Sequence, residues 1–145
     1  MISIRKATLA DSNQLISLVE QLGYKLNEET MKKNINAYIQ LPNRELIVAE
    51  MDGNVIGCLA LDLLPTFHAE EKQMRIISLV VDQLCRGKGI GRFLLHAAED
   101  IAKKEQCWMI ELTSSSRREK DGTHAFYINE GYAKNGNQAY FRKYI

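Results

Sequence analysis

Apolar and polar residues repeat along the chain with two periods, and these periods predict its secondary structure. Alternation, or a short continuous apolar run, predicts strands over residues 2–7, 45–50, 54–64, 74–81, 108–113 and 138–144. Apolar residues three or four apart predict helices between Thr8 and Gly23, between Asn27 and Pro42, from Gly89 to Glu105 and from Thr123 to Gly131. The polar segments 66–73 and 114–122 are expected to be connections.

Local signals support these boundaries. Thr8 with Asp11 predicts a capping box, and Asn27 predicts an N-cap. Asp52-Gly53 predicts a hairpin turn, because both residues tolerate positive φ. The third helix is expected to turn a set of apolar residues inward: Phe93, Leu94, Ala97, Ala98 and Ile101.

The order of elements indicates an α/β fold with a central mixed sheet and helices on both faces, in a single domain over residues 1–145. The continuous apolar end of the strand 74–81 predicts burial on both faces of the sheet. The last predicted strand, over 138–144, offers an edge through which a homodimer could pair.

Composition narrows the classes of partner. A formal net charge of +1 gives no overall attraction to nucleic acid or to an anionic membrane. We also find no apolar run near the roughly 20 residues of a membrane span and no signal-peptide pattern. Cys58, Cys85 and Cys107 are odd in number and far apart, so they predict neither a disulfide framework nor a zinc site. A reducing, cytoplasmic setting is the simplest expectation.

The stretch "CRGKGIGRFLL", residues 85–95, joins a predicted strand to a predicted helix and carries glycine at alternate positions. Glycine exposes backbone N–H groups at a helix N-terminus, where they and the helix dipole favour an anion such as a phosphate. A dinucleotide fingerprint would need glycine where Arg92 stands, and a P-loop would need serine or threonine at Gly89. A tight turn with solvated cations remains the alternative.

The residues Arg86, Gly89 and Gly91 match the pattern Arg/Gln-x-x-Gly-x-Gly/Ala, and the whole run 79–95 resembles the central motif of the GNAT superfamily of N-acetyltransferases. The opening "IRKATLADSNQLISLV" and the late "HAFYINEGY" are similar to two further stretches of that family. The resemblance therefore covers nearly the whole chain and implies the GNAT fold.

The resemblance also implies acetyl-CoA as cosubstrate, with no metal. The loop Arg86, Gly87, Lys88, Gly89, Ile90 and Gly91 would hold the pyrophosphate, with Arg92 nearby. Backbone groups of Leu79, Val80 and Val81 would pair with the pantetheine arm. The apolar side chains of these three residues also suit an ordinary core strand.

By the same resemblance, Tyr127 would act as general acid toward the leaving thiolate; the alternative is a tyrosine that only packs the short helix. The family's strand glutamate is absent, since Ile77 and Ser78 stand at the corresponding positions. His68, Glu70 and Glu71 are the nearby candidates for the general base, and a water chain or an already neutral amine remain alternatives.

The implied function is transfer of an acetyl group from acetyl-CoA to a primary amine of a small molecule or peptide, by direct attack on the thioester. The alternative is a regulatory module that binds acyl-CoA on the same fold without turnover. The basic residues Arg117, Arg118 and Lys120 could meet CoA phosphates or an acidic substrate group, or could be solvated.

Overall fold

The structure is a computed structural model that describes residues 1–114, 121–134 and 137–145. Its contacts divide the chain into two compact units, Met1–Thr113 and Ser114–Ile145, which we describe separately. The expectation of a single domain stays a prediction. The stretch with Arg117, Arg118 and Lys120 lies outside the described residues.

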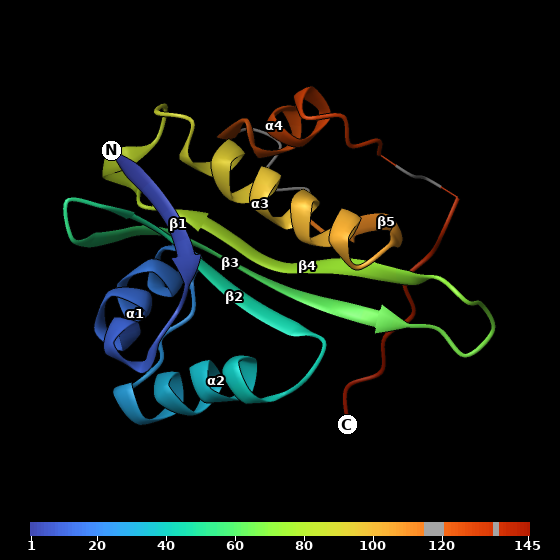
Figure 1. Cartoon of the computed structure of the whole chain (residues 1–145), viewed down its shortest axis with the longest axis horizontal. Helices are drawn as coiled ribbons and strands as arrows, with labels where there is room; N and C mark the ends of the chain where they lie inside the picture. Colours follow the sequence, from blue (N-terminus) through green and yellow to red (C-terminus); the bar gives the residue numbers. More distant parts are fainter. Residues whose placement is uncertain (115–120, 135–136) are drawn as a thin grey trace. The chain divides into compact units, whose positions relative to one another are not determined.

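The first unit is built on a five-stranded mixed sheet (Figure 1). Its strands are β1 (Ile2–Lys6), β2 (Arg44–Met51), β3 (Asn54–Pro65), β4 (Lys72–Val81) and β5 (Cys107–Leu112). They lie in the order β1-β2-β3-β4-β5, and every neighbouring pair is antiparallel except β4 with β5, which is parallel. The predicted mixed sheet is confirmed.

Helices cover both faces of this sheet, as predicted (Figure 1). On one face α1 (Ser12–Gln21) and α2 (Glu28–Gln40) pack over a core cluster that includes Leu15, Leu18, Met31, Ile35 and Val48. On the other face lies α3 (Ile90–Lys104), with a set of fully buried residues: Ile90, Leu94, Leu95 and Ala98.

The start of α1 shows how local sequence fixes an element. Asp11 ends a short 3₁₀ turn, and its carboxylate accepts a hydrogen bond of 2.8 Å from the backbone N–H of Thr8, as a capping box requires. The same carboxylate accepts hydrogen bonds from both terminal guanidinium nitrogens of Arg5, at 2.8 and 2.9 Å. These Arg5 bonds are the main reason why the pKa of Asp11 lies below its ordinary value. The predicted N-cap of α2 is likewise confirmed, since Asn27 accepts from the N–H of Thr30 at 2.8 Å.

Three details differ from the sequence expectations. The described residues 137–145 form no strand, so the element predicted over 138–144 was wrong. The end of β4 is buried on one face only: Val80 is buried, whereas Leu79 and Val81 are half-buried and Ile77 is 47% exposed. In α3 the side chain of Phe93 is 52% exposed, because Ile90 and Leu94 take the inward positions of the first turn.

The second unit contains the short helix α4 (Thr123–Asn129), which was predicted and ends near Gly131. No helix of the described residues is long and apolar enough to cross a membrane.

Candidate functional site

The loop between β4 and α3 has the geometry of an anion-binding turn. Gly87 and Gly89 have φ values of +83° and +79°, a left-handed conformation that favours glycine. A Cβ at Gly87 would meet nothing within 4 Å, so the backbone conformation, and not lack of space, calls for glycine there. The residues from Arg86 to Gly89 are all exposed.

The N-terminus of α3 opens onto this loop. The N–H of Phe93 donates to the carbonyl of Gly89 at 3.0 Å, which is the first bond of the helix. The N–H groups of Ile90 and Gly91 precede that bond and therefore have no partner within the helix. Gly89 is the N-cap and offers no side chain to take them. Together with the helix dipole, these donors fit a bound phosphate.

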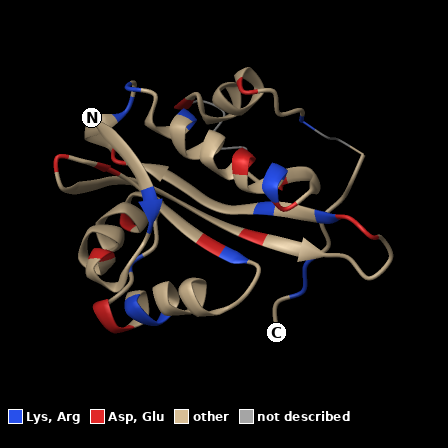
Figure 2. Cartoon of the chain, viewed as in Figure 1, with Lys and Arg blue, Asp and Glu red and all other residues tan. Residues whose placement is uncertain are grey.

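Basic residues surround the same donors. Figure 2 shows basic positions on the loop and on the first turn of α3, where the sequence has Arg86, Lys88 and Arg92. Arg86 also donates from Nε to the carbonyl of Val81 at 3.4 Å, which ties the loop to the end of β4. The local charge is positive although the whole chain is nearly neutral.

Beside the loop, the second half of β4 has an unpaired edge. The parallel ladder with β5 runs from Lys72↔Cys107 to Ile76↔Leu112 and then stops. On the other side, Ser78 to Val81 stay paired with β3, and a register shift leaves Ile77 outside that pairing. Among the described residues, no strand pairs with Leu79–Val81 on the β5 side. Apart from the Val81 carbonyl, which accepts from Arg86, backbone groups on this edge could pair with an extended ligand that lies along the strand.

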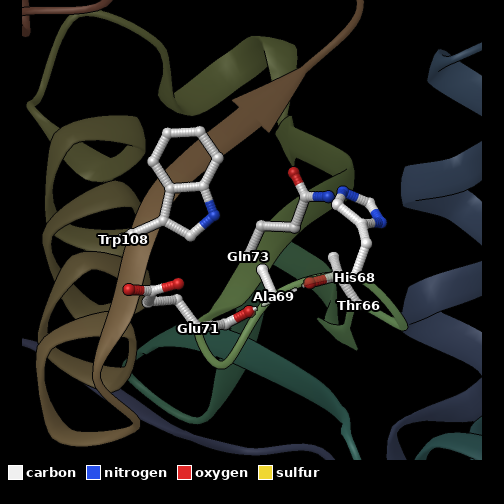
Figure 3. A pocket seen from close by; sticks show the side chains of 6 residues that line it. All are labelled: Thr66, His68, Ala69, Glu71, Gln73 and Trp108. Atoms are coloured by element: carbon white, nitrogen blue, oxygen red, sulfur yellow. Dashed lines mark hydrogen bonds between the residues drawn. The ribbon is translucent and has the colours of Figure 1, made fainter.

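The base candidates lie at the opposite end of β4. His68, Glu70 and Glu71 belong to the β3–β4 connection, and all three are exposed. His68 and Glu71 help to line a pocket of about 290 Å³ with Thr66, Ala69, Gln73 and Trp108 (Figure 3). β4 has 10 residues, so at about 3.3 Å per residue its two ends lie about 30 Å apart. The structure therefore brings His68 and Glu71 together, but away from the glycine loop.

Tyr127 lies in α4 and is half-buried. Its ring meets Phe126 and Tyr132 edge to face, with centroid distances of 5.1 and 6.0 Å. The N–H of Tyr132 donates to the carbonyl of Tyr127 at 3.0 Å and closes the end of the helix. The neighbours thus pack Tyr127 into its own unit, and its role toward the thioester stays a prediction.

A row of alternating charges, which the sequence analysis missed, crosses four strands. Its members are paired directly in the sheet register: Arg44↔Asp62, Asp62↔Arg75 and Arg75↔Glu111. Arg44 Nε lies 3.7 Å from Asp62 Oδ1, and Arg75 Nη1 lies 3.0 Å from Glu111 Oε1. We call these four residues the charge row.

The charge row lies on the face of the sheet covered by α1 and α2. Tyr38 of α2 stacks on the Arg44 guanidinium, 5.3 Å from ring centroid to Cζ. Burial, with a further contribution from the Asp62 charge, raises the pKa of Tyr38 above its ordinary value. At the other end of the row, the side chains of Arg75 and Glu111 remain 32% and 33% exposed. The sequence carries no distinct signal for this row, because Arg44 stands beside Glu45 in β2 and Lys72 shares β4 with Arg75.

Buried thiols and metal-binding groups offer no further site within the described residues. Burial raises the pKa of the Cys58 thiol to about 12, which makes it unreactive. No group of three or more His, Cys, Asp or Glu side chains in this part of the chain is placed to hold a metal ion.

Comparison with known proteins shows the family of the chain. The family model described as "Acetyltransferase (GNAT) family" matches residues 12–132. An aminoalkylphosphonate N-acetyltransferase of Salmonella typhimurium is 30% identical over 140 residues, which cover 96% of this chain and 87% of the relative.

Solved structures show the same fold. A GNAT family acetyltransferase of Staphylococcus aureus superposes with a TM-score of 0.82 at 26% identity, covering 99% of this chain and 98% of the other. Glucosamine-6-phosphate N-acetyltransferase of Arabidopsis thaliana gives a TM-score of 0.82 with the same coverage and 22% identity, which concerns the fold alone. From the match over residues 12–132 and the relative that spans nearly the whole chain, we conclude that this protein belongs to the GNAT acetyltransferase family.

Proposed function

We propose that the protein transfers an acetyl group from acetyl-CoA to a primary amine of a small molecule or peptide, by direct attack of the amine on the thioester. One observation carries the proposal. The uncapped start of α3 and the free edge of β4 lie next to each other in the chain, separated only by the segment 82–89. A ligand with a diphosphate followed by an extended amide-containing arm matches both features.

In this proposal the backbone from Arg86 to Gly91 holds the pyrophosphate, and Lys88 and Arg92 add positive charge. The pantetheine amides pair with Leu79–Val81 in the manner of an added strand. Val81 is followed immediately by the loop segment, so the arm runs back along β4 from the diphosphate toward Ile77. The thioester then reaches the point where β4 and β5 stop pairing.

The chemistry requires a neutral amine and a proton for the leaving group. A free alkylamine with a pKa of about 10.4 is neutral in only about one molecule in a few thousand at neutral pH, so deprotonation must accompany binding. The amine nitrogen bonds to the carbonyl carbon, the carbon–sulfur bond breaks, and the amine proton passes to solvent. Tyr127 protonates the departing CoA thiolate and is reprotonated from solvent.

The relative from Salmonella typhimurium is named for aminoalkylphosphonates. Small amines that also carry an anionic group are therefore the first acceptors to test on this chain. The three cysteines are all free thiols, which supports a reducing, cytoplasmic setting.

Replacing Tyr127 by phenylalanine tests the proposal. We expect Tyr127→Phe to lower kcat about 100-fold, since general acid–base catalysis contributes about that much, while acetyl-CoA affinity changes less than twofold. Turnover is followed as CoA thiol release over a panel of amines, and affinity by calorimetry. Tyr140→Phe is the matched control, because Tyr140 is 71% exposed and lies in the same unit.

The alternative function has a different signature. If the purified protein binds acetyl-CoA but releases no CoA with any amine, and Tyr127→Phe changes nothing, the protein is an acyl-CoA-binding module without turnover. If the purified protein does not bind acetyl-CoA, both candidate functions, the enzyme and the binding module without turnover, are excluded.

A further inference from the structure

The segment that leads from β4 into the glycine loop, residues 82–85, is fixed by hydrogen bonds. The N–H of Asp82 donates to the carbonyl of Ile56 in β3 at 2.8 Å, and the N–H of Cys85 donates to the carbonyl of Asp82 at 2.8 Å. The Asp82 carboxylate accepts from the N–H of Leu84 at 3.0 Å. Three of the four N–H groups of segment 82–85 are therefore satisfied by β3 or by the segment itself.

The fourth N–H group of this segment is satisfied by a side chain of α1. Gln21, the last residue of that helix, accepts at Oε1 from the N–H of Gln83 at 2.9 Å. The two residues are 62 positions apart in the chain, so no local sequence signal reveals this bond. Because α1 and α3 cover opposite faces of the sheet (Figure 1), the chain between β4 and α3 is tied to helices on both faces.

A hollow lies beside this hydrogen bond. Its volume is about 390 Å³, and it is lined by residues of α1, of the β2–β3 hairpin and of segment 82–85. Leu84 lines the hollow but is 84% exposed, so it does not pack firmly against α1. Because side chains do not fill this space, the Gln21 hydrogen bond holds the segment to α1 where apolar packing does not.

The residues that follow segment 82–85 make such an anchor useful. Gly87 and Gly89 have positive φ, and glycine loses more conformational freedom than other residues when its conformation is fixed. A loop that binds a diphosphate through its backbone must adopt one conformation, and a loop already held at both ends loses less entropy on binding. Helix α3 holds one end of this loop, and segment 82–85 holds the other.

We propose that Gln21 is a positioning residue for the loop from Arg86 to Gly91, which we call the donor loop. Its hydrogen bond to the N–H of Gln83 holds segment 82–85 to α1 and so keeps the donor loop in the conformation that receives the acyl-CoA diphosphate. This inference rests on the proposed function and adds a residue of α1 to the machinery that binds the donor. Gln21 acts through Gln83 and not by contact with the ligand.

Gln14 is the matched control on the same helix. Its Oε1 accepts from the N–H of Val55 at 2.7 Å, which is the same kind of bond, and it lines the same hollow as Gln21. Val55 belongs to β3 and not to the segment before the donor loop. Gln21→Ala and Gln14→Ala therefore remove equivalent hydrogen bonds, and a general loss of stability appears in both variants.

Amide hydrogen exchange of the protein without ligand, followed by NMR, tests the anchor. In Gln21→Ala the protection of the Gln83 N–H is expected to fall about fivefold, because a hydrogen bond of this kind contributes about that factor. In Gln14→Ala the protection of the Val55 N–H falls instead, and that of Gln83 stays within twofold of wild type. Gln21→Glu keeps an acceptor oxygen at the same reach and is expected to restore the protection of Gln83.

Acetyl-CoA affinity, measured by calorimetry, tests the consequence for the ligand. Gln21→Ala is expected to raise the Kd about fivefold, and Gln14→Ala to leave it within twofold of wild type. In turnover, the KM for acetyl-CoA should rise with the Kd while kcat stays within twofold, because the lost interaction stabilises the bound ground state and the transition state equally. Two results would overturn the inference: Gln21→Ala binds acetyl-CoA within twofold of wild type, or Gln14→Ala weakens binding as much as Gln21→Ala.

The two measurements also separate this inference from the proposed function. If wild type binds and turns over acetyl-CoA and Gln21→Ala has unchanged affinity, the role of Gln21 is removed and the function is kept. If wild type does not bind acetyl-CoA but the protection of Gln83 depends on Gln21, the function and the diphosphate ligand are removed, and Gln21 is kept only as an anchor of the loop.

Discussion

The two ends of β4 differ in what defines them. At the Val81 end, the loop to α3 is defined by backbone: two glycines with positive φ and a helix start whose N–H groups no side chain caps. At the Lys72 end, the connection from β3 is defined by side chains, with His68 and Glu71 around a pocket beside Trp108. The Val81 end thus presents backbone dipoles, and the Lys72 end presents exposed side chains.

Strand pairing sharpens the contrast. At its start, β4 pairs with both neighbours, through Pro65↔Lys72 on one side and Lys72↔Cys107 on the other. Toward Val81, β3 is the one strand among residues 1–114, 121–134 and 137–145 that pairs with β4. Strand β4 is therefore paired on both sides at its Lys72 end and has one free edge at its Val81 end. We infer that the Val81 end carries the chemistry and the Lys72 end supports the fold.

The largest expected effect comes from charge at the loop. Gly89→Asp and Gly89→Asn add side chains of nearly equal size, and both residue types tolerate the left-handed conformation better than most others. Only aspartate brings a negative charge against the pyrophosphate. We expect Gly89→Asp to weaken acetyl-CoA binding about 100-fold relative to Gly89→Asn, by calorimetry at low salt. Equal affinities for the two variants would remove the anion-binding role of the loop.

The next effect concerns how α3 is held against the sheet. A Cβ at Gly57 in β3 would lie 3.1 Å from Leu94 Cδ1 and 3.1 Å from the Val80 carbonyl oxygen. Because that oxygen belongs to a paired strand, it cannot easily move. We expect Gly57→Ala to lower the free energy of unfolding by about 1–3 kcal/mol in thermal or denaturant unfolding.

A double-mutant cycle with Leu94→Ala sharpens this prediction. Leu94→Ala removes one of three close contacts but leaves the carbonyl oxygen of Val80 and Cγ2 of Ile90, which would lie 3.3 Å from the new Cβ. The cost of Gly57→Ala should therefore fall, but not vanish, in that background. An unchanged cost would mean that α3 does not approach β3 as closely as described.

Most helices and strands of the first unit could be predicted from the sequence. The start of α3, the strands β1 to β5, the capping box of Thr8 with Asp11 and the N-cap Asn27 each follow from a local signal: a glycine, a period of two, or a polar residue before a helix. Such signals depend on a few neighbouring residues, so they can be recognised without knowledge of the tertiary structure.

The predictions that were wrong concern features that depend on tertiary contacts, which a local sequence pattern does not reveal. The run "MRIISLVV" is continuous and apolar, yet Ile77 is 47% exposed and lies outside the pairing with β3. Phe93 fits a helical period, but Ile90 and Leu94 occupy the buried positions. The charge row was invisible because Arg44, Asp62, Arg75 and Glu111 meet only through the register of four strands.

The smallest expected effect is at the hairpin end, where sequence reasoning placed the general base. His68 and Glu71 are exposed, and the length of β4 separates them from the donor loop. In the proposed function the amine reacts near Ile77, where β4 and β5 stop pairing. Glu71 precedes Ile77 by six residues, about 20 Å of strand, so a proton cannot pass directly from that amine to His68 or Glu71. We therefore expect His68→Ala and Glu71→Gln each to leave kcat/KM for the amine within about twofold of wild type, at pH 7 and at pH 9. A tenfold loss at pH 7 that disappears at pH 9, where more of the amine is neutral, would instead identify the hairpin as part of the deprotonation step and bring the two ends of β4 into one site.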